Sequence, residues 1–64
     1  MKDFQQRVVD EKAELDAKLT RLTAFFETDT FKALPEAERQ RLTLQHDYMS
    51  GYSEVLGERI AAFV

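Results

Sequence analysis

Two long stretches of the sequence repeat apolar residues with the period of an α-helix, and only a short polar segment separates them. In residues 3–27 and in residues 35–63, apolar side chains recur at alternating steps of three and four, once polar interruptions are allowed. These positions are Val8, Leu15, Leu19, Leu22 and Phe26 in the first stretch, and Leu42, Met49, Tyr52, Leu56 and Phe63 in the second. Such spacing places one apolar stripe along each helix. The sequence therefore predicts an all-α protein, an antiparallel two-helix hairpin that forms a single domain over residues 1–64.

The segment between the two stretches is expected to form a short helical turn. Residues 27–30 are a polar break, and Thr28 or Asp29 can cap a turn over residues 30–34. Pro35 suits the first position of the second helix, where its missing N–H group costs nothing. The turn would then close one end of the hairpin.

More apolar residues are present than one contact line between two helices can cover. They are Phe4, Val9, Phe25, Phe31, Leu34, Leu44, Tyr48, Val55, Ile60 and Val64. A chain of 64 residues is near the size at which a single core barely offsets chain entropy, and chains this small commonly add disulfides, a metal or partner subunits. The sequence has no cysteine and one histidine, so neither a disulfide nor a structural metal site is expected. We therefore expect a homo-oligomeric helical bundle without a cofactor.

Two stripes of small side chains are candidates for the oligomer interface, because narrow stripes let another helix approach closely. They are Ser50, Ser53, Gly57 and Ala61 in the second helix, and Ala13, Ala17, Thr20 and Ala24 in the first. A glycine inside a helix costs roughly 1 kcal/mol relative to alanine, so Gly51 and Gly57 indicate close approach of a neighbouring chain or a bound ligand. The alternative for the glycines is a tolerated bend at Ser50-Gly51. For the alanines, the alternative is that they are present only because alanine favours helices.

Charge and composition restrict the class of partner. The net charge is −3, and acidic and basic residues are interspersed, which argues against binding to duplex nucleic acid. No apolar run has the length of a signal peptide or a membrane span. The expected location is the cytosol.

Two tyrosines on the second helix are candidates for ligand binding. Tyr48 and Tyr52 are four residues apart and share one side of the helix, with Arg41, Arg59 and Lys12 expected nearby. Aromatic rings stack on bases, and the arginine fork binds phosphate. The alternative is that both tyrosines belong to the packing between the helices.

Catalysis is not predicted. His46 has no serine or cysteine arrangement around it that the sequence reveals, and no glycine-rich phosphate loop is present. The acidic residues of the first helix lack a histidine at metal-ligand spacing and the loop glycine of a calcium site.

The sequence resembles a group of small phage-encoded helical-hairpin proteins, described by their relation to a reading frame of a crAss-like phage. The resemblance covers almost the whole chain and is carried by "FQQRVVDEKAELDAKLTRLTAFF", "TFKALPEAERQRLTLQ", Tyr48-Met49, Tyr52-Ser53, Val55-Leu56 and Glu58-Arg59-Ile60. Pro35 departs from the serine or aspartate cap expected at that place. The resemblance implies a phage or prophage accessory protein of the host bacterial cytoplasm, and it brings no catalytic residues.

The leading hypothesis is that this homo-oligomer counters host defence by sequestering a phosphate-bearing, cyclic nucleotide signal between its subunits. An alternative is a helical interaction module that blocks a host or phage protein, with Leu44, Tyr48 and Val55 as anchors. A third possibility is a virion or assembly component that has no ligand.

Overall fold

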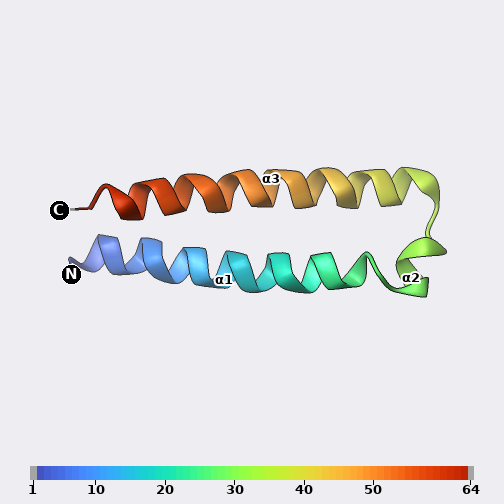
Figure 1. Cartoon of the computed structure of the whole chain (residues 1–64), viewed down its shortest axis with the longest axis horizontal. Coiled ribbons are helices and arrows are strands. Elements are labelled where there is room, and N and C mark those ends of the chain that lie inside the picture. Colours follow the sequence, from blue (N-terminus) through green and yellow to red (C-terminus); the bar gives the residue numbers. More distant parts are fainter. Residues whose placement is uncertain (1, 64) are drawn as a thin grey trace.

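The computed structural model describes residues 2–63, and these residues form three helices. α1 spans Asp3–Phe25, α2 spans Asp29–Lys32 and α3 spans Glu36–Ala61. Helices α1 and α3 lie side by side and run in opposite directions, with α2 at the end where the chain turns and both ends of the chain at the other (Figure 1). The prediction of an all-α protein is confirmed.

The molecule is a narrow rod. Its extents are 47 × 15 × 13 Å, and its radius of gyration is 14.7 Å, whereas a compact domain of this length would have a radius of gyration of about 11 Å. Every residue is therefore close to the surface. Within residues 2–63, no helix combines the length and the apolar content that crossing a membrane requires.

The end of α1 and the start of α2 are fixed by one threonine. The Thr28 hydroxyl donates to the carbonyl of Phe25 at 2.6 Å, and its oxygen accepts from the N–H group of Phe31 at 3.2 Å. The Phe31 ring then packs against the rings of Phe25 and Phe26, with centroid distances of 5.8 and 4.8 Å. The short turn was thus predicted correctly, although it starts one residue earlier than expected and α1 ends before residue 27.

Pro35 lies just before α3 and is not its first helical residue. Its ψ of 147° is not helical, while its carbonyl accepts from the N–H groups of Glu38 at 3.0 Å and Arg39 at 3.1 Å. Proline suits this place because it has no N–H group to satisfy. The predicted start of the helix is therefore wrong by one residue.

The apolar core between α1 and α3 is small. Val8, Leu15 and Leu56 are buried, with Leu56 fully enclosed, and Met49, Ile60 and Phe63 pack against them. The sequence assigned Tyr52 to this seam, but Tyr52 is 45% exposed and Ser53 is buried instead. Met49 and Leu56 are seven residues apart, so either position 52 or position 53 satisfies the helical repeat. The hydrogen bonds of Ser53 described below select position 53.

Several of the surplus apolar residues are covered by the chain itself. Ile60 packs on the core, and Val9, Phe25, Phe31 and Leu34 are half-buried. In contrast, Leu44 is 51% exposed, Tyr48 is 73% exposed and Val55 is 50% exposed. Phe4 is also 50% exposed, although its ring meets the Phe63 ring edge-on at 6.0 Å. Val64, the last residue of this set, lies outside the described residues. The surplus is therefore concentrated on α3.

Candidate functional site

The side of α3 that faces away from α1 carries most of the exposed apolar surface. Leu44, Tyr48, Tyr52 and Val55 follow one another at steps of four, four and three, so they lie along one side of the helix. The buried residues Ser53 and Leu56 point toward α1. This outer side of α3 has no role in the packing of the two helices, except that the Tyr52 hydroxyl donates to the Glu11 carboxylate.

Two arginines lie on the same side of α3 as the two tyrosines. Arg41 is exposed and its Nε donates to the Glu38 carboxylate at 3.0 Å, while Arg59 is exposed near the other end. Four of the five predicted ligand residues therefore share one side of one helix. At 1.5 Å per residue, Arg41 and Arg59 are about 27 Å apart along α3. One small ligand on one chain cannot contact both.

Lys12, the fifth predicted ligand residue, lies in the seam between the helices. Its Nζ donates to the Asp16 carboxylate at 2.8 Å and to the Ser53 hydroxyl at 2.9 Å, and that hydroxyl donates to Asp16 at 2.5 Å. These hydrogen bonds from Lys12 and Ser53 lower the pKa of Asp16, against the opposing effect of desolvation, and the charge of Lys12 adds to the lowering. The three groups satisfy one another within the seam, so the structure does not bring Lys12 together with the arginines and tyrosines of α3.

The two stripes of small residues have different surroundings. Ser53 is buried and Gly57 is half-buried against α1, where a Cβ on Gly57 would lie 3.4 Å from Cε of Lys12. The other small residues of these stripes are exposed: Ser50, Ala61, Ala13, Ala17, Thr20 and Ala24. Within the chain, Ser53 and Gly57 thus make room for the Lys12 side chain.

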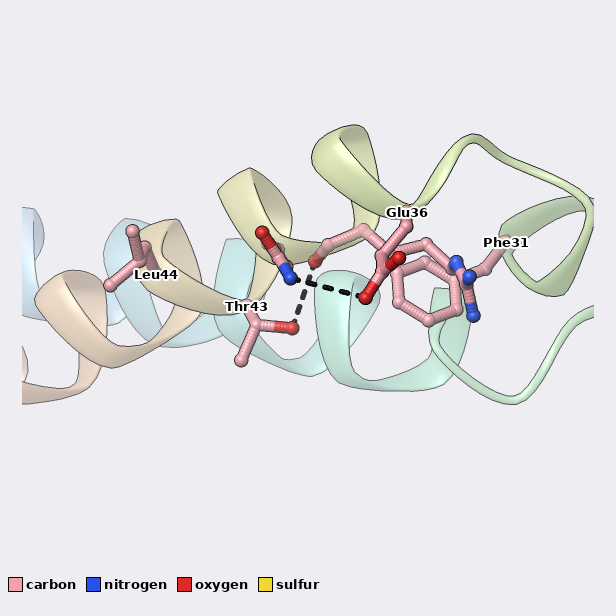
Figure 2. Close-up of a pocket in the computed structure, with 6 residues that line it drawn as sticks. Phe31, Glu36, Thr43 and Leu44 are labelled. Atoms are coloured by element: carbon pink, nitrogen blue, oxygen red, sulfur yellow. Dashed lines mark hydrogen bonds between the residues drawn. The ribbon is translucent and has the colours of Figure 1, made fainter.

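An open groove lies beside the turn, next to the start of the outer side of α3 (Figure 2). Its walls come from α2 and the first turns of α3, and are formed by Phe31, Glu36, Arg39, Gln40, Thr43 and Leu44. Gln40 Nε2 donates to Glu36 at 3.4 Å, and the Thr43 hydroxyl donates to the backbone carbonyl of Arg39 at 2.9 Å. The Nε atom of Arg39 is buried and has no hydrogen-bond partner within residues 2–63. The sequence did not indicate that Arg39 and the Phe31 ring line one groove.

A second groove lies between α1 and α3, in the half of the rod nearer the turn. It is lined by Leu19, Thr20, Thr23, Ala24, Glu27, His46 and Ser50. The Thr23 hydroxyl and His46 Nε2 are 3.1 Å apart, and the imidazole lies 5.5 Å from the Phe26 ring. His46 is therefore a half-buried packing residue. Among residues 2–63, no three side chains of the metal-binding types gather closely enough to hold an ion.

The structure defines a small all-α protein of two long helices joined by a short helical turn, with Lys12, Asp16 and Ser53 hydrogen-bonded in an otherwise apolar seam. The chain belongs to the Sequestin family, whose model matches residues 2–62. It is also 35% identical, over 60 residues, to a protein of Enterobacteria phage T4 described as "Uncharacterized 7.5 kDa protein in denB-rIIB intergenic region", and the match covers 94% of each chain. No solved structure matches the chain. The expected relation to small phage proteins is confirmed, whereas the narrower relation to crAss-like phage stays a prediction.

Proposed function

We propose that this chain is a non-enzymatic phage protein that binds and sequesters a phosphate-bearing, cyclic nucleotide signal, and so counters host defence in the bacterial cytoplasm. The family description, Sequestin, supports a sequestering role, and the T4 relative supports a phage setting. Sequestration requires binding alone, so the proposal needs no catalytic group.

The observation that carries the proposal is the pairing of arginine and tyrosine on the exposed side of α3. Tyr48 is 73% exposed, and the side chain of Arg41 is 68% exposed. Stacking of a base on an aromatic ring contributes about 1 to 3 kcal/mol per base, and the guanidinium group binds phosphate through two parallel hydrogen bonds. Contiguous exposed apolar patches mark sites where a partner or ligand binds, and Tyr48 lies in such a group with Leu44, Tyr52 and Val55.

The ligand site is proposed to lie between subunits. The rod is only two helices thick, and the arginines and tyrosines of one chain extend over about 27 Å. A second copy of the chain would add a wall to this open surface and remove water from it. Both effects strengthen stacking and the contacts to phosphate.

Isothermal titration calorimetry with cyclic dinucleotides, cyclic trinucleotides, cyclic mononucleotides and their linear counterparts tests the proposal. Saturable binding of at least one cyclic nucleotide is expected, together with a higher melting temperature in its presence. Tyr48→Ala and Arg59→Gln should weaken that binding, whereas Arg21→Gln on the exposed surface of α1 is the matched control. Chromatography of the ligand after denaturation should recover it intact, which separates sequestration from hydrolysis. No heat across the panel and an unchanged melting temperature would remove the proposal.

A second candidate function uses the same surface. The exposed anchors Leu44, Tyr48 and Val55 have the spacing with which a helix docks into a groove of another protein. In that case the chain would block a host or phage protein. A stoichiometric protein partner captured from bacterial lysate, together with calorimetric silence toward nucleotides, would favour this function over the first.

A further inference from the structure

The outer side of α3 carries a second helical repeat that the packing against α1 does not use. Its members are all exposed, follow one another at alternating steps of four and three, and run along almost the whole helix: Ala37, Arg41, Leu44, Tyr48, Gly51, Val55, Glu58 and Ala62. A repeat of seven residues with this spacing is the pattern by which two helices pack along a seam. Here the seam lies opposite the one that faces α1.

The repeat is complementary to itself when it is read in the reverse direction. Around a point between residues 49 and 50, each position meets one that is compatible in charge or size: Arg41 meets Glu58, Leu44 meets Val55, Tyr48 meets Gly51, and Ala37 meets Ala62. A cation thus meets an anion, a large ring meets a position without a side chain, and small meets small. In antiparallel pairs of helices, such layers are the contacts across the seam.

We propose that α3 pairs with α3 of a second copy, antiparallel and around a two-fold axis between residues 49 and 50. This inference rests on the homo-oligomer of the proposed function and names its interface. A two-fold axis makes each contact occur twice, because the same surface is used by both copies. The two-fold pairing therefore contains two Arg41–Glu58 contacts and two Tyr48–Gly51 contacts.

Gly51 supports the pairing independently. It lies within α3, and a Cβ built on it would meet nothing within 4 Å. Packing within the chain thus gives no reason for a glycine that costs about 1 kcal/mol relative to alanine in a helix interior. The Tyr48 ring of the second copy would fill this open place. The ring is 73% exposed in the single chain.

The opposite, parallel pairing brings like with like. Arg41 would meet Arg41, Glu58 would meet Glu58, and the Tyr48 rings would meet at the same level as each other. Like charges held opposite each other at a desolvated seam cost several kcal/mol. The order of residues along α3 therefore favours the antiparallel pairing.

The two edges of the proposed pair differ in charge. One edge gathers, from both copies, the four α3 residues proposed to bind the ligand: Arg41, Tyr48, Tyr52 and Arg59. Along this edge Arg41 comes near Arg59 of the second copy, and Tyr48 comes near Tyr52 of the second copy, so two equivalent clusters form. The other edge carries Asp47 and Glu54 from both copies. Like charges approach one another on both edges, and they oppose association weakly, because exposed charges are screened by salt.

Charge reversal at Arg41 and Glu58 tests the pairing. Arg41→Glu alone and Glu58→Arg alone each place two like-charge pairs in the seam, and we expect each to weaken association at least about tenfold. Mixing the two variants in equal amounts restores both contacts, so a mixed assembly with one copy of each is expected. Arg21→Glu and Glu14→Arg, on the exposed surface of α1, make the same charge changes away from the seam.

Native mass spectrometry and sedimentation of the full chain report the assembly, while circular dichroism checks that each variant stays helical. The pairing is overturned if the wild-type chain is a monomer, if both single variants keep the wild-type mass, or if the mixture fails to recover it. A recovered mixed assembly that binds no nucleotide would remove the ligand proposal and leave the pairing in place. If the single variants keep the wild-type mass and still bind nucleotide, the pairing is removed and the ligand proposal stays in place.

Discussion

Replacement of Leu56 by alanine tests how the two long helices hold together. Within residues 2–63, Leu56 is the only residue whose large side chain is fully buried. The change removes three carbon groups, worth about 2.4 kcal/mol at about 0.8 kcal/mol each, and the cavity left behind raises the loss toward 5 kcal/mol. A chain of this length has a free energy of unfolding of about 3 to 10 kcal/mol. We therefore expect Leu56→Ala to be largely unfolded or close to it.

Urea denaturation followed by circular dichroism, at several protein concentrations, measures this effect. The same change at Leu15, which is 9% exposed, should cost about 2 to 5 kcal/mol. At Leu44, which is 51% exposed, it should cost about 1 kcal/mol or less in the most dilute samples. Its cost should increase with concentration if association covers Leu44. An equal loss for Leu44→Ala and Leu56→Ala in dilute solution would refute this account of the core.

Three other substitutions have defined outcomes. The pKa of Asp16 is lowered in the folded chain. Its hydrogen bonds with Lys12 and Ser53 therefore stabilise the fold at pH values above the ordinary titration range of aspartate. This contribution is lost as the pH falls through the lowered pKa. Asp16→Asn should therefore make the unfolding midpoint less sensitive to acid, and an unchanged pH profile would contradict the assignment. Gly57→Ala should raise the melting temperature, because the helix gains about 1 kcal/mol and the added Cβ makes an ordinary contact with the flexible Lys12 side chain. A lower melting temperature would mean that the Lys12 side chain cannot adjust. Thr28→Ala removes the cap of α2 and should cost about 1 kcal/mol in urea denaturation, whereas a neutral result would show that the Phe31 contacts alone hold the turn.

The sequence predicted the helical class, the two long helices and the turn between them, because these depend on local repeats and caps. Helix ends were less accurate, since Pro35 can either precede a helix or begin one. The choice between Tyr52 and Ser53 in the seam could not be predicted, because both satisfy the repeat. Lys12 was expected near the tyrosines, and its partners in the seam were not identified. A cation in an apolar stripe needs partners, and Asp16, four residues later, was an available one.

For the candidate site, the sequence identified Arg41, Tyr48, Tyr52 and Arg59, and the structure places these four along one side of α3. Whether they bind a ligand stays a prediction. Lys12 was expected beside them because the helix register brings it to the level of Tyr52. The direction of its side chain is set by Asp16 and Ser53 in the seam, which the sequence did not reveal. The groove with Phe31 and Arg39 was missed as a unit, because it forms only when α2 folds back beside the start of α3.

The contact of Phe4 with Phe63 places the first turn of α1 beside the last turn of α3. A linker of a few residues could therefore join the chain into a ring without bending either helix. Such a ring would restrict the unfolded chain and leave the folded one unchanged, so it should resist heat and exopeptidases better than the open form.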